Sequence, residues 1–280
     1  EINFLSSKSE YKEKKIILEN LSNGKTNLII GTHSLFQKNI KFKNLGLCII
    51  DEQHKFGVKQ RIELSNKGGN DCDILVMSAT PIPRTLVLTL YGDMDVSRLK
   101  EKPINRKSII TLSKPEEKIE EVLIFVENEI KKGNQVFWVC PLIEESKNLD
   151  YSAAVNKFKL LSKRFNKKVG IIHGNLDKKE KEKVLDLFSK NKLSILVSTT
   201  VIEVGVDYPN VTVIVIENSN KFGLSQLHQL RGRVGRGSIQ GTCILLYKKN
   251  LSENAKKRIR ILKSSDDGFF IAEEDMKLRG

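Results

Sequence analysis

Short apolar runs rich in β-branched residues alternate with amphipathic stretches of helix length along almost the whole sequence. This alternation is typical of a parallel sheet covered by helices. The expected strands are Asn27–Ile30, Leu45–Ile50, Ile74–Ser78, Ser108–Leu112, Gln135–Cys140, Lys168–His173, Ser194–Ser198, Val211–Glu217 and Thr242–Tyr247. The expected helices are Lys8–Leu21, a segment after Val58, Pro83–Leu90, Glu116–Lys131, Tyr151–Phe165, Lys178–Ser189, Leu224–Arg233 and two more between Ser252 and Gly280. The sequence therefore predicts an α/β fold, and the unbroken apolar run Leu45–Ile50 predicts a strand buried on both faces.

The alternation lapses once, in the polar and proline-bearing stretch Arg98–Arg106, which predicts a linker. A chain of 280 residues has room for two domains that each bury a core. We expect a first α/β lobe over residues 1–100, a second over 101–250 and a helical extension over 251–280. Two similar lobes in tandem create a cleft in which a ligand can be shared.

The net charge of +14 and the pI of about 9.5 favour an anionic partner, with nucleic acid first. This is weak support, because many lysines stand singly on expected helix faces. No apolar run approaches the ~18 residues of a membrane span, and the first residues lack the apolar core of a signal peptide. Cys48, Cys72, Cys140 and Cys243 have neither metal-ligand nor redox spacing, which predicts buried reduced thiols in a cytosolic protein.

The segment Gln226–Gly237 places three arginines and three glycines within one short stretch. If the segment is helical, its two faces differ. The apolar face holds Leu227, Leu230 and Val234, and the opposite face holds Gln229, Gly232, Arg233 and Arg236. Two converging guanidiniums suit a polyphosphate, because the planar fork of arginine matches phosphate oxygens. A solvated basic helix end or a general nucleic-acid patch explains the segment equally well at this point.

The acidic segment Asp51-Glu52-Gln53-His54 follows the expected strand Leu45–Ile50 directly. Ligands of open α/β sheets bind at the carboxyl ends of strands. One carboxylate there can hold Mg²⁺, and its neighbour can orient or deprotonate an attacking water. An acidic turn is the bland alternative, but it does not account for two carboxylates followed by Gln-His.

Two further strand ends carry small hydroxyl residues. Ser78-Ala79-Thr80 follows the strand after Asp51, so its hydroxyls can bond the neighbouring carboxylates and transmit movement. In Ser198–Asp207, Thr199 and Thr200 could contact a nucleic-acid backbone, and Gly205 with Asp207 a ribose or phosphate. A capped turn with Thr199 or Thr200 as N-cap is the alternative, and the residues alone favour it.

The tripeptide Gly-Lys-Thr within Asn23–Thr26 resembles part of a phosphate-binding loop. That loop needs an earlier glycine where Glu19 stands, and it must follow a strand and open a helix. Here the tripeptide follows an expected helix and precedes a strand. Gly24 is therefore expected to be a helix C-cap, and this segment is not a phosphate-binding loop.

Taken together, these motifs resemble those of superfamily 2 helicases with two RecA-like lobes, and most closely the RecG family of branched-DNA helicases. The residues that carry the resemblance are Gly31–Gln37, Asp51–Val58, Met77–Thr85, Cys140–Ser146, Thr199–Asp207, Phe222–Gly237 and Ala272–Gly280. The transcription-repair coupling factor shares much of the arginine segment. It usually has Asp-Glu-Glu-His where this chain has Asp51-Glu-Gln-His54, so RecG is favoured.

The resemblance implies ATP and Mg²⁺ as cofactors and a role for each matching residue. Asp51 would hold Mg²⁺ with Glu52 beside it positioning the water, and Gln53 and His54 would couple the nucleotide to movement. Ser78, Ala79 and Thr80 would link the nucleotide to the DNA side. Residues near DNA would be Gly31, Thr32, His33, Thr199 and Thr200. Residues at the nucleotide would be Gly205, Asp207, Gln229, Arg233 and Arg236, with Arg236 as the arginine finger.

The resemblance also implies parts that this sequence does not contain. The family has a DNA-binding wedge domain and a phosphate-binding loop upstream, and a Thr-Arg-Gly motif downstream. We therefore expect a motor fragment with a truncated first lobe, inactive as an ATPase alone. Its parent would remodel stalled forks and Holliday junctions in recombination and repair.

We expect branched or duplex DNA as the partner, no membrane, a monomer, and contacts with single-stranded-DNA-binding or replication-fork proteins. The expected location is the bacterial cytoplasm, in association with the nucleoid. Two alternatives stay open at this point. One is the motor of a transcription-repair coupling translocase, and the other is a non-catalytic nucleic-acid-binding module.

Overall fold

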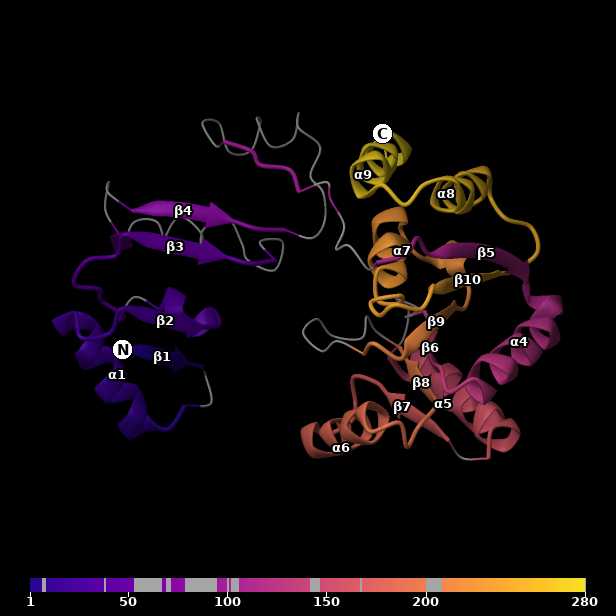
Figure 1. The fold of residues 1–280 in the computed structure, drawn as a ribbon, viewed down its shortest axis with the longest axis horizontal. Coiled ribbons are helices and arrows are strands. Elements are labelled where there is room, and N and C mark those ends of the chain that lie inside the picture. The colour runs from indigo at the N-terminus through magenta and orange to yellow at the C-terminus, as the bar shows by residue number, and fades with distance from the viewer. Residues whose placement is uncertain are drawn as a thin grey trace. The chain divides into compact units, whose positions relative to one another are not determined.

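The structure is a computed structural model that describes residues 1–6, 9–37, 39–52, 67–68, 72–78, 95–99, 101, 106–141, 147–166, 168–199 and 208–279. The chain divides into two compact units, Glu1–Ala79 and Thr80–Gly280. Figure 1 draws the helices and strands of each unit as a ribbon. The division lies closer to the N-terminus than the expected lobe boundary at residue 100, which stays a prediction.

The first unit begins with a parallel pair of short strands, β1 (Ile2–Leu5) and β2 (Leu28–Gly31), joined by the helix α1 (Tyr11–Asn23). Strand β1 was not among the expected strands. The helix seats Ile17 and Leu21 on Leu5, and these side chains form a buried cluster with Ile40. The cluster explains the local fold, because the apolar residues of α1 recur at helical spacing and meet the one buried residue of β1.

Gly24 ends α1 in the left-handed conformation, with φ +74° and ψ +21°. Its N–H donates to Leu21 O at 3.3 Å, which satisfies a carbonyl at the helix end. The expected C-cap is therefore confirmed, and Gly-Lys-Thr here follows a helix rather than opening one.

A second parallel pair in this unit consists of β3 (Leu47–Ile50) and β4 (Asp73–Val76). Burial alternates along β3. Cys48 and Ile50 are buried against Phe36, whereas Leu47 is 55% and Ile49 54% exposed. The expectation that this strand is buried on both faces is wrong for the structure. The physical reason is that Phe36 and Cys72 cover the face of β3 that bears Cys48 and Ile50, whereas the other face is only partly covered.

The second unit is built on a six-stranded parallel sheet in the order β5-β10-β9-β6-β8-β7 (Figure 1). Its strands are β5 (Ile110–Pro115), β6 (Gln135–Val139), β7 (Val169–Ile172), β8 (Ile195–Ser198), β9 (Val211–Ile216) and β10 (Thr242–Tyr247). From β6 the chain first builds β7 and β8 on one side and then β9 and β10 on the other. The carboxyl ends of β6 and β9 therefore lie at the topological switch point, where open α/β sheets bind ligands.

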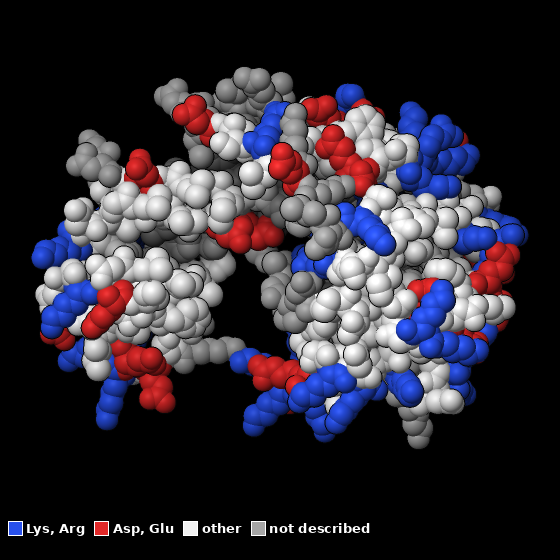
Figure 2. All heavy atoms as spheres, in the orientation of Figure 1, with Lys and Arg blue, Asp and Glu red and all other residues white. Residues whose placement is uncertain are grey.

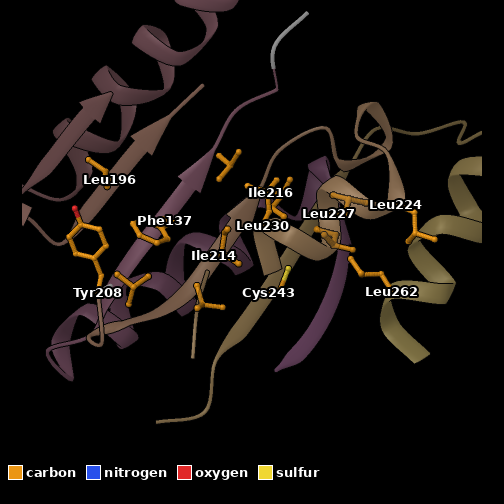
Figure 3. Packing of buried hydrophobic residues seen from close by; sticks show 14 of the residues in the cluster. Phe137, Leu196, Tyr208, Ile214, Ile216, Leu224, Leu227, Leu230, Cys243 and Leu262 are labelled. Carbon is orange, nitrogen blue, oxygen red and sulfur yellow. The ribbon is translucent and has the colours of Figure 1, made fainter. Parts of the chain in front are cut away.

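Helices cover both faces of this sheet, as the sequence pattern predicts. The helices are α4 (Ile119–Lys131), α5 (Lys147–Arg164), α6 (Lys178–Ser189), α7 (Leu224–Arg231), α8 (Glu253–Ser264) and α9 (Gly268–Arg279), with short 3-10 turns η4 (Glu116–Lys118) and η5 (Ser219–Lys221). The remaining described 3-10 turn, η1 (His33–Phe36), belongs to the first unit. Helices α4 and α5 share a core with Val136 and Trp138. Helices α6 to α9 share the other core with Phe137 and Val139 (Figure 3). Successive residues of β6 thus face opposite cores, which is the period of a strand.

The C-terminal residues form two helices that break near Asp266–Gly268, as expected. Ser252 caps α8, since its Oγ accepts a hydrogen bond from Ala255 N at 3.3 Å. Ile259 and Leu262 of α8 and Ile271 of α9 are buried in the core of the second unit. The extension is therefore packed on the sheet rather than standing apart from it.

All four cysteines are free thiols, and Cys48, Cys140 and Cys243 are buried as expected, whereas Cys72 is partly exposed. Burial is the main reason why the pKa of Cys48 is raised to about 11 and that of Cys243 to about 12. Within the described residues, no helix combines the length and the apolar character that a membrane crossing requires.

Candidate functional site

The acidic pair and Ser78, the first residue of the hydroxyl motif, follow the carboxyl ends of the neighbouring strands β3 and β4. The parallel register pairs Ile50 with Val76, and the Met77 N–H donates to Ile50 O at 2.8 Å. Asp51 and Glu52 therefore follow the end of β3, and Ser78 follows the end of the neighbouring strand β4. The structure brings these three predicted residues together, since parallel strands end at the same edge of a sheet.

The two carboxylates have different surroundings. Asp51 is exposed, and its Oδ1 accepts a hydrogen bond from Glu52 N at 2.8 Å. Glu52 has φ +50°, a left-handed backbone that costs a non-glycine residue about 1–2 kcal/mol, and its Oε2 is out of contact with solvent. Such strain persists only where the surroundings enforce it, and it is concentrated at functional sites. The bend directs the two adjacent carboxylates into different environments.

The carboxylates fit a magnesium ion that is held mainly by other ligands. Mg²⁺ prefers oxygen donors and usually keeps several waters, with one or two protein carboxylates. No group of three or more His, Cys, Asp or Glu side chains suited to a metal occurs among the described residues. Asp51 and Glu52 match the one or two carboxylates that Mg²⁺ usually takes from a protein.

Thr32 and His33 are exposed directly after β2, at the start of the turn η1. Gly31 precedes them, and a Cβ there would lie 2.5 Å from Leu5 O, so the close approach of β1 requires glycine. Ser34 and Phe36 anchor the turn, with Phe36 packed against β3. The turn thus presents a hydroxyl and an imidazole to solvent from a fixed position in the first unit.

The arginine segment of the second unit begins as the helix α7. Gly223 precedes it, and its N–H donates to Gln226 Oε1 at 2.9 Å, which satisfies one donor at the helix start. Leu224, Leu227 and Leu230 are buried in the core shown in Figure 3. The apolar face that the spacing predicts is therefore confirmed, and Val234 beyond the helix is buried as well.

The helix ends at Arg231, two residues before the expected end, so Arg233 and Arg236 are presented by a turn and not by a helix face. Gly235 has φ +65°, and a Cβ on it would lie 3.1 Å from Gly241 N. Arg236 is exposed, and its Nε donates to Gly232 O at 3.3 Å. Arg233 and Gln229 are half-buried. The expected helix end at Arg233 is thus wrong, and Arg233 and Arg236 both follow α7 closely.

Arg231 is a structural residue that the sequence analysis did not single out. It is buried, and its guanidinium joins α7 to α8 and β5. Nη1 donates to Leu262 O at 2.5 Å, to Ser265 O at 2.9 Å and to Thr111 Oγ1 at 3.3 Å, and Nη2 lies 2.9 Å from His228 Nδ1. Burial lowers the pKa of Arg231, but the guanidinium remains charged. Its position four residues after Leu227, on the apolar face, is the signal that could have found it.

A buried polar cluster at the switch point was also missed. Glu217 follows β9, and its Oε1 accepts hydrogen bonds from Trp138 Nε1 at 3.0 Å and from Lys157 Nζ at 2.6 Å. Lys157 Nζ also lies 5.6 Å from the centre of the Trp138 ring. Cys140 Sγ lies 3.7 Å from Glu217 Oε2. Burial is the larger cause that raises the pKa of this thiol, and the negative charge of Glu217 is the smaller one. The cluster ties the ends of β6 and β9 to α5.

Two family models match the chain. The DEAD/DEAH box helicase model covers residues 2–88, and the helicase conserved C-terminal domain model covers residues 114–238. The ATP-dependent DNA helicase RecG of Bacillus subtilis (strain 168) is 50% identical over 278 residues, which are 99% of this chain and 40% of that protein. The RecG of Escherichia coli (strain K12) is 44% identical over 287 residues, covering 100% of this chain and 41% of that protein. The chain is homologous to the RecG helicases.

A solved structure supports the same relationship in three dimensions. The structure of RecG bound to a three-way DNA junction matches with a TM-score of 0.77 and 46% identity, over 99% of this chain and 36% of that one. The yeast protein Dbp5 bound to RNA and ADP BeF3 matches with a TM-score of 0.64 at 18% identity, which supports the fold alone. The resemblance to RecG and the α/β fold with two RecA-like lobes are confirmed. The chain spans about two fifths of the length of the RecG proteins from B. subtilis and E. coli.

Of the remaining predicted site residues, the structure describes Thr199 alone. Thr199 is buried, at 4% exposure, and its N–H donates to Ile172 O at 3.3 Å. Its contact with DNA stays a prediction. The predicted residues that lie outside the described residues are Gln53, His54, Ala79, Thr80, Thr200, Gly205 and Asp207.

Proposed function

We propose that this chain is the motor region of an ATP-dependent DNA helicase that remodels branched DNA. The observation that carries the proposal is the meeting of Asp51, Glu52 and Ser78 at one sheet edge, in a chain homologous to RecG over nearly its whole length. That edge has the composition of a nucleotide-hydrolysis site, and the related RecG in the solved structure is bound to a three-way DNA junction.

ATP and Mg²⁺ are the cofactors of this proposal. Asp51 would hold the ion, which supplies positive charge against the phosphates when it is bound. Glu52, bent away from Asp51 by its left-handed backbone, would accept the proton of the attacking water. Arg233 and Arg236 would bind phosphate oxygens, with Arg236 as the finger because its side chain is exposed. Gln229, Gly205 and Asp207 complete the proposed nucleotide residues, and Gln53, His54, Ala79 and Thr80 the coupling residues.

DNA is the proposed substrate, in the form of forks and four-way junctions. Exposed Thr32 and His33 suit contact with a sugar-phosphate backbone, since hydroxyl and imidazole groups bond phosphate oxygens. Thr199 and Thr200 are the corresponding residues proposed for the second unit. We further propose a monomeric bacterial protein that works on nucleoid DNA beside single-stranded-DNA-binding or replication-fork proteins. Light scattering and co-purification from bacterial cells test these two points.

The Glu52→Gln variant of the complete gene product tests the proposed function. DNA-stimulated ATP hydrolysis is expected to fall by ~10²-fold or more, because general-base catalysis contributes about that much. Glu182→Gln on the exposed face of α6 is the matched control and should retain full turnover. Normal hydrolysis in Glu52→Gln would remove the role given to Glu52, and the absence of DNA-stimulated hydrolysis in the unaltered protein would remove the proposal.

A further inference from the structure

A basic groove lies between α8 and the edge of the large sheet. Its cavity measures about 400 Å³ and is lined by Ser113, Tyr247, Leu251, Lys256, Ile259, Arg260, Lys263 and Ser264. Strand β5, which carries Ser113, is the edge strand of the sheet, and α8 packs over it on the face that also bears α6, α7 and α9. None of these residues belongs to the nucleotide or DNA residues considered above.

The cations of the groove form one row. Lys256, Arg260 and Lys263 follow one another at helical steps of four and three, so they share a face of α8, and all three are exposed. No carboxylate is among the described residues that line the groove. Lys256 pairs with Glu253 at 2.8 Å, whereas Arg260 and Lys263 have no ion pair within the described residues. Like charges four apart on a helix repel each other, so the row has an electrostatic cost that an anionic ligand would relieve.

Other lysines near this edge of the sheet are arranged differently. Lys114 and Lys118 both reach Glu121, at 2.7 and 3.1 Å, and Lys249 reaches Glu117 at 3.0 Å. Those cations are neutralised by carboxylates of the same unit. Figure 2 shows lysine and arginine side chains gathered over α8. In the row on α8, Glu253 pairs with Lys256 and lies within electrostatic reach of Arg260, so one carboxylate faces three cations and the row keeps a net positive charge.

We propose that this groove binds the phosphodiester backbone of a single DNA strand. The row from Lys256 to Lys263 spans about 10 Å, since a helix rises 1.5 Å per residue. Successive phosphates of one strand advance by about 3.4 Å along a duplex and by more when the strand is extended, so the row can meet two or three of them. The hydroxyls of Ser113 and Tyr247 line the same groove and can bond phosphate or sugar oxygens.

The floor of the groove favours a single strand over a duplex. This floor is the apolar part of the lining, formed by Tyr247, Leu251 and Ile259. A duplex keeps its bases stacked inside, so it could use the cations but not this floor. A single strand can place a sugar or base against an aromatic and apolar surface while its phosphates meet the cations. A cation row beside an apolar floor therefore suits the single strand that unwinding releases. The source of that strand, though not the binding itself, rests on the proposed function.

The test measures binding of a fluorescein-labelled oligothymidylate to the chain without nucleotide, by anisotropy over a range of salt concentrations. The variant Lys256→Gln/Arg260→Gln/Lys263→Gln is expected to bind on the order of 100-fold more weakly at 0.1 M salt, with a slope of log K against log salt smaller by ~2. The matched control is Lys179→Gln/Lys183→Gln/Lys190→Gln on α6 and its C-cap. It removes three exposed cations over the same face of the sheet, one of them ion-paired at 2.8 Å.

Equal losses in the two triple variants would overturn the proposal, because binding would then follow total charge and not the groove. Far-ultraviolet circular dichroism of each variant excludes unfolding as the cause. Tyr247→Leu sharpens the test, since it should weaken binding of the single strand several-fold and leave a duplex of equal charge unaffected. A variant that weakens both equally would contradict the role of the floor.

Two further outcomes separate this site from its alternatives. If an acidic peptide displaces the oligothymidylate at lower concentration than an unlabelled strand of equal charge, the groove is a protein-binding site and the proposal fails. Because binding is measured without ATP, its result is independent of hydrolysis. Groove-dependent binding by this chain, with no ATP hydrolysis by the complete gene product, would remove the motor function alone. Hydrolysis by the complete gene product, with no contribution of α8 to strand binding, would remove the groove alone.

Discussion

Two strands of similar apolar sequence have different surroundings in the two units. All six residues of β9 are buried, because β10 and β6 flank it and helices cover both faces of its sheet. In β3, Cys48 and Ile50 are buried while Leu47 and Ile49 are about half exposed. An apolar run therefore shows that a strand can be buried on both faces. The neighbours that pack against it decide whether it is.

Replacing one isoleucine in each strand tests this comparison most strongly. Ile214→Ala in β9 is expected to destabilise the second unit by about 3–4 kcal/mol, through lost burial and a cavity. Ile49→Ala in β3 should cost ~1 kcal/mol in the first unit, since half of its side chain is already exposed. Urea unfolding followed by fluorescence reports the second unit, because Trp138 is the only tryptophan of the chain. Hydrogen exchange of β3 reports the first unit. Equal costs would mean that the outer face of β3 is covered in solution.

The next largest effect concerns the buried guanidinium of Arg231 in the second unit. Arg231→Met is expected to cost about 3 kcal/mol, because Leu262 O and Ser265 O would be left buried without their donor. Protection from hydrogen exchange should fall first in α8. The matched variant Arg236→Met removes an exposed guanidinium and should leave stability nearly unchanged. If both variants unfold at the same urea concentration, Arg231 does not fasten α8 to α7.

Glu217 offers a smaller test at the switch point of the same sheet. Glu217→Gln is expected to cost about 2 kcal/mol, because Lys157 loses its partner in a mostly buried position. The emission of Trp138 should also shift, since its indole N–H donates to this carboxylate. Glu120→Gln breaks the more exposed pair with Arg164 at 2.6 Å and should change neither property measurably. An unchanged emission maximum in Glu217→Gln would contradict the placement of the cluster.

Much of the fold could be predicted because it depends on local pattern. Helix α6 and strand β10 have the bounds that their spacing predicts, and the other described elements with an expected counterpart lie within a few residues of it. Strand β1 was missed because it is four residues long, contains Asn3, and has one buried residue to mark it. The end of α7 was misplaced because Arg233 fits the helical spacing, although the backbone turns after Arg231.

The candidate site could be predicted as far as topology places it. Asp51 and Ser78 meet because parallel strands end at one edge, which the order of strands and helices indicates. Arg231 and Glu217 could not be assigned partners in this way. Arg231 bonds carbonyls 31 and 34 residues away, and Glu217 bonds Trp138 across 79 residues. Such pairs depend on how helices pack, and a single sequence does not encode that in any local spacing.

The smallest effect tests the first unit at the end of α1. Gly24→Ala is expected to cost ~1 kcal/mol, because φ +74° places a Cβ in a strained conformation. The nearest atom to that Cβ would be Lys43 Cδ at 2.6 Å, which is the far part of a flexible side chain and can move. Gly46→Ala is the matched control, since no atom lies within 4 Å of its Cβ position. Hydrogen exchange in α1 should rise in the first variant alone, with the unfolding of Trp138 unchanged in both. A loss of Trp138 fluorescence at lower urea in Gly24→Ala would mean that the two units unfold together, and the stability of each could then no longer be compared separately.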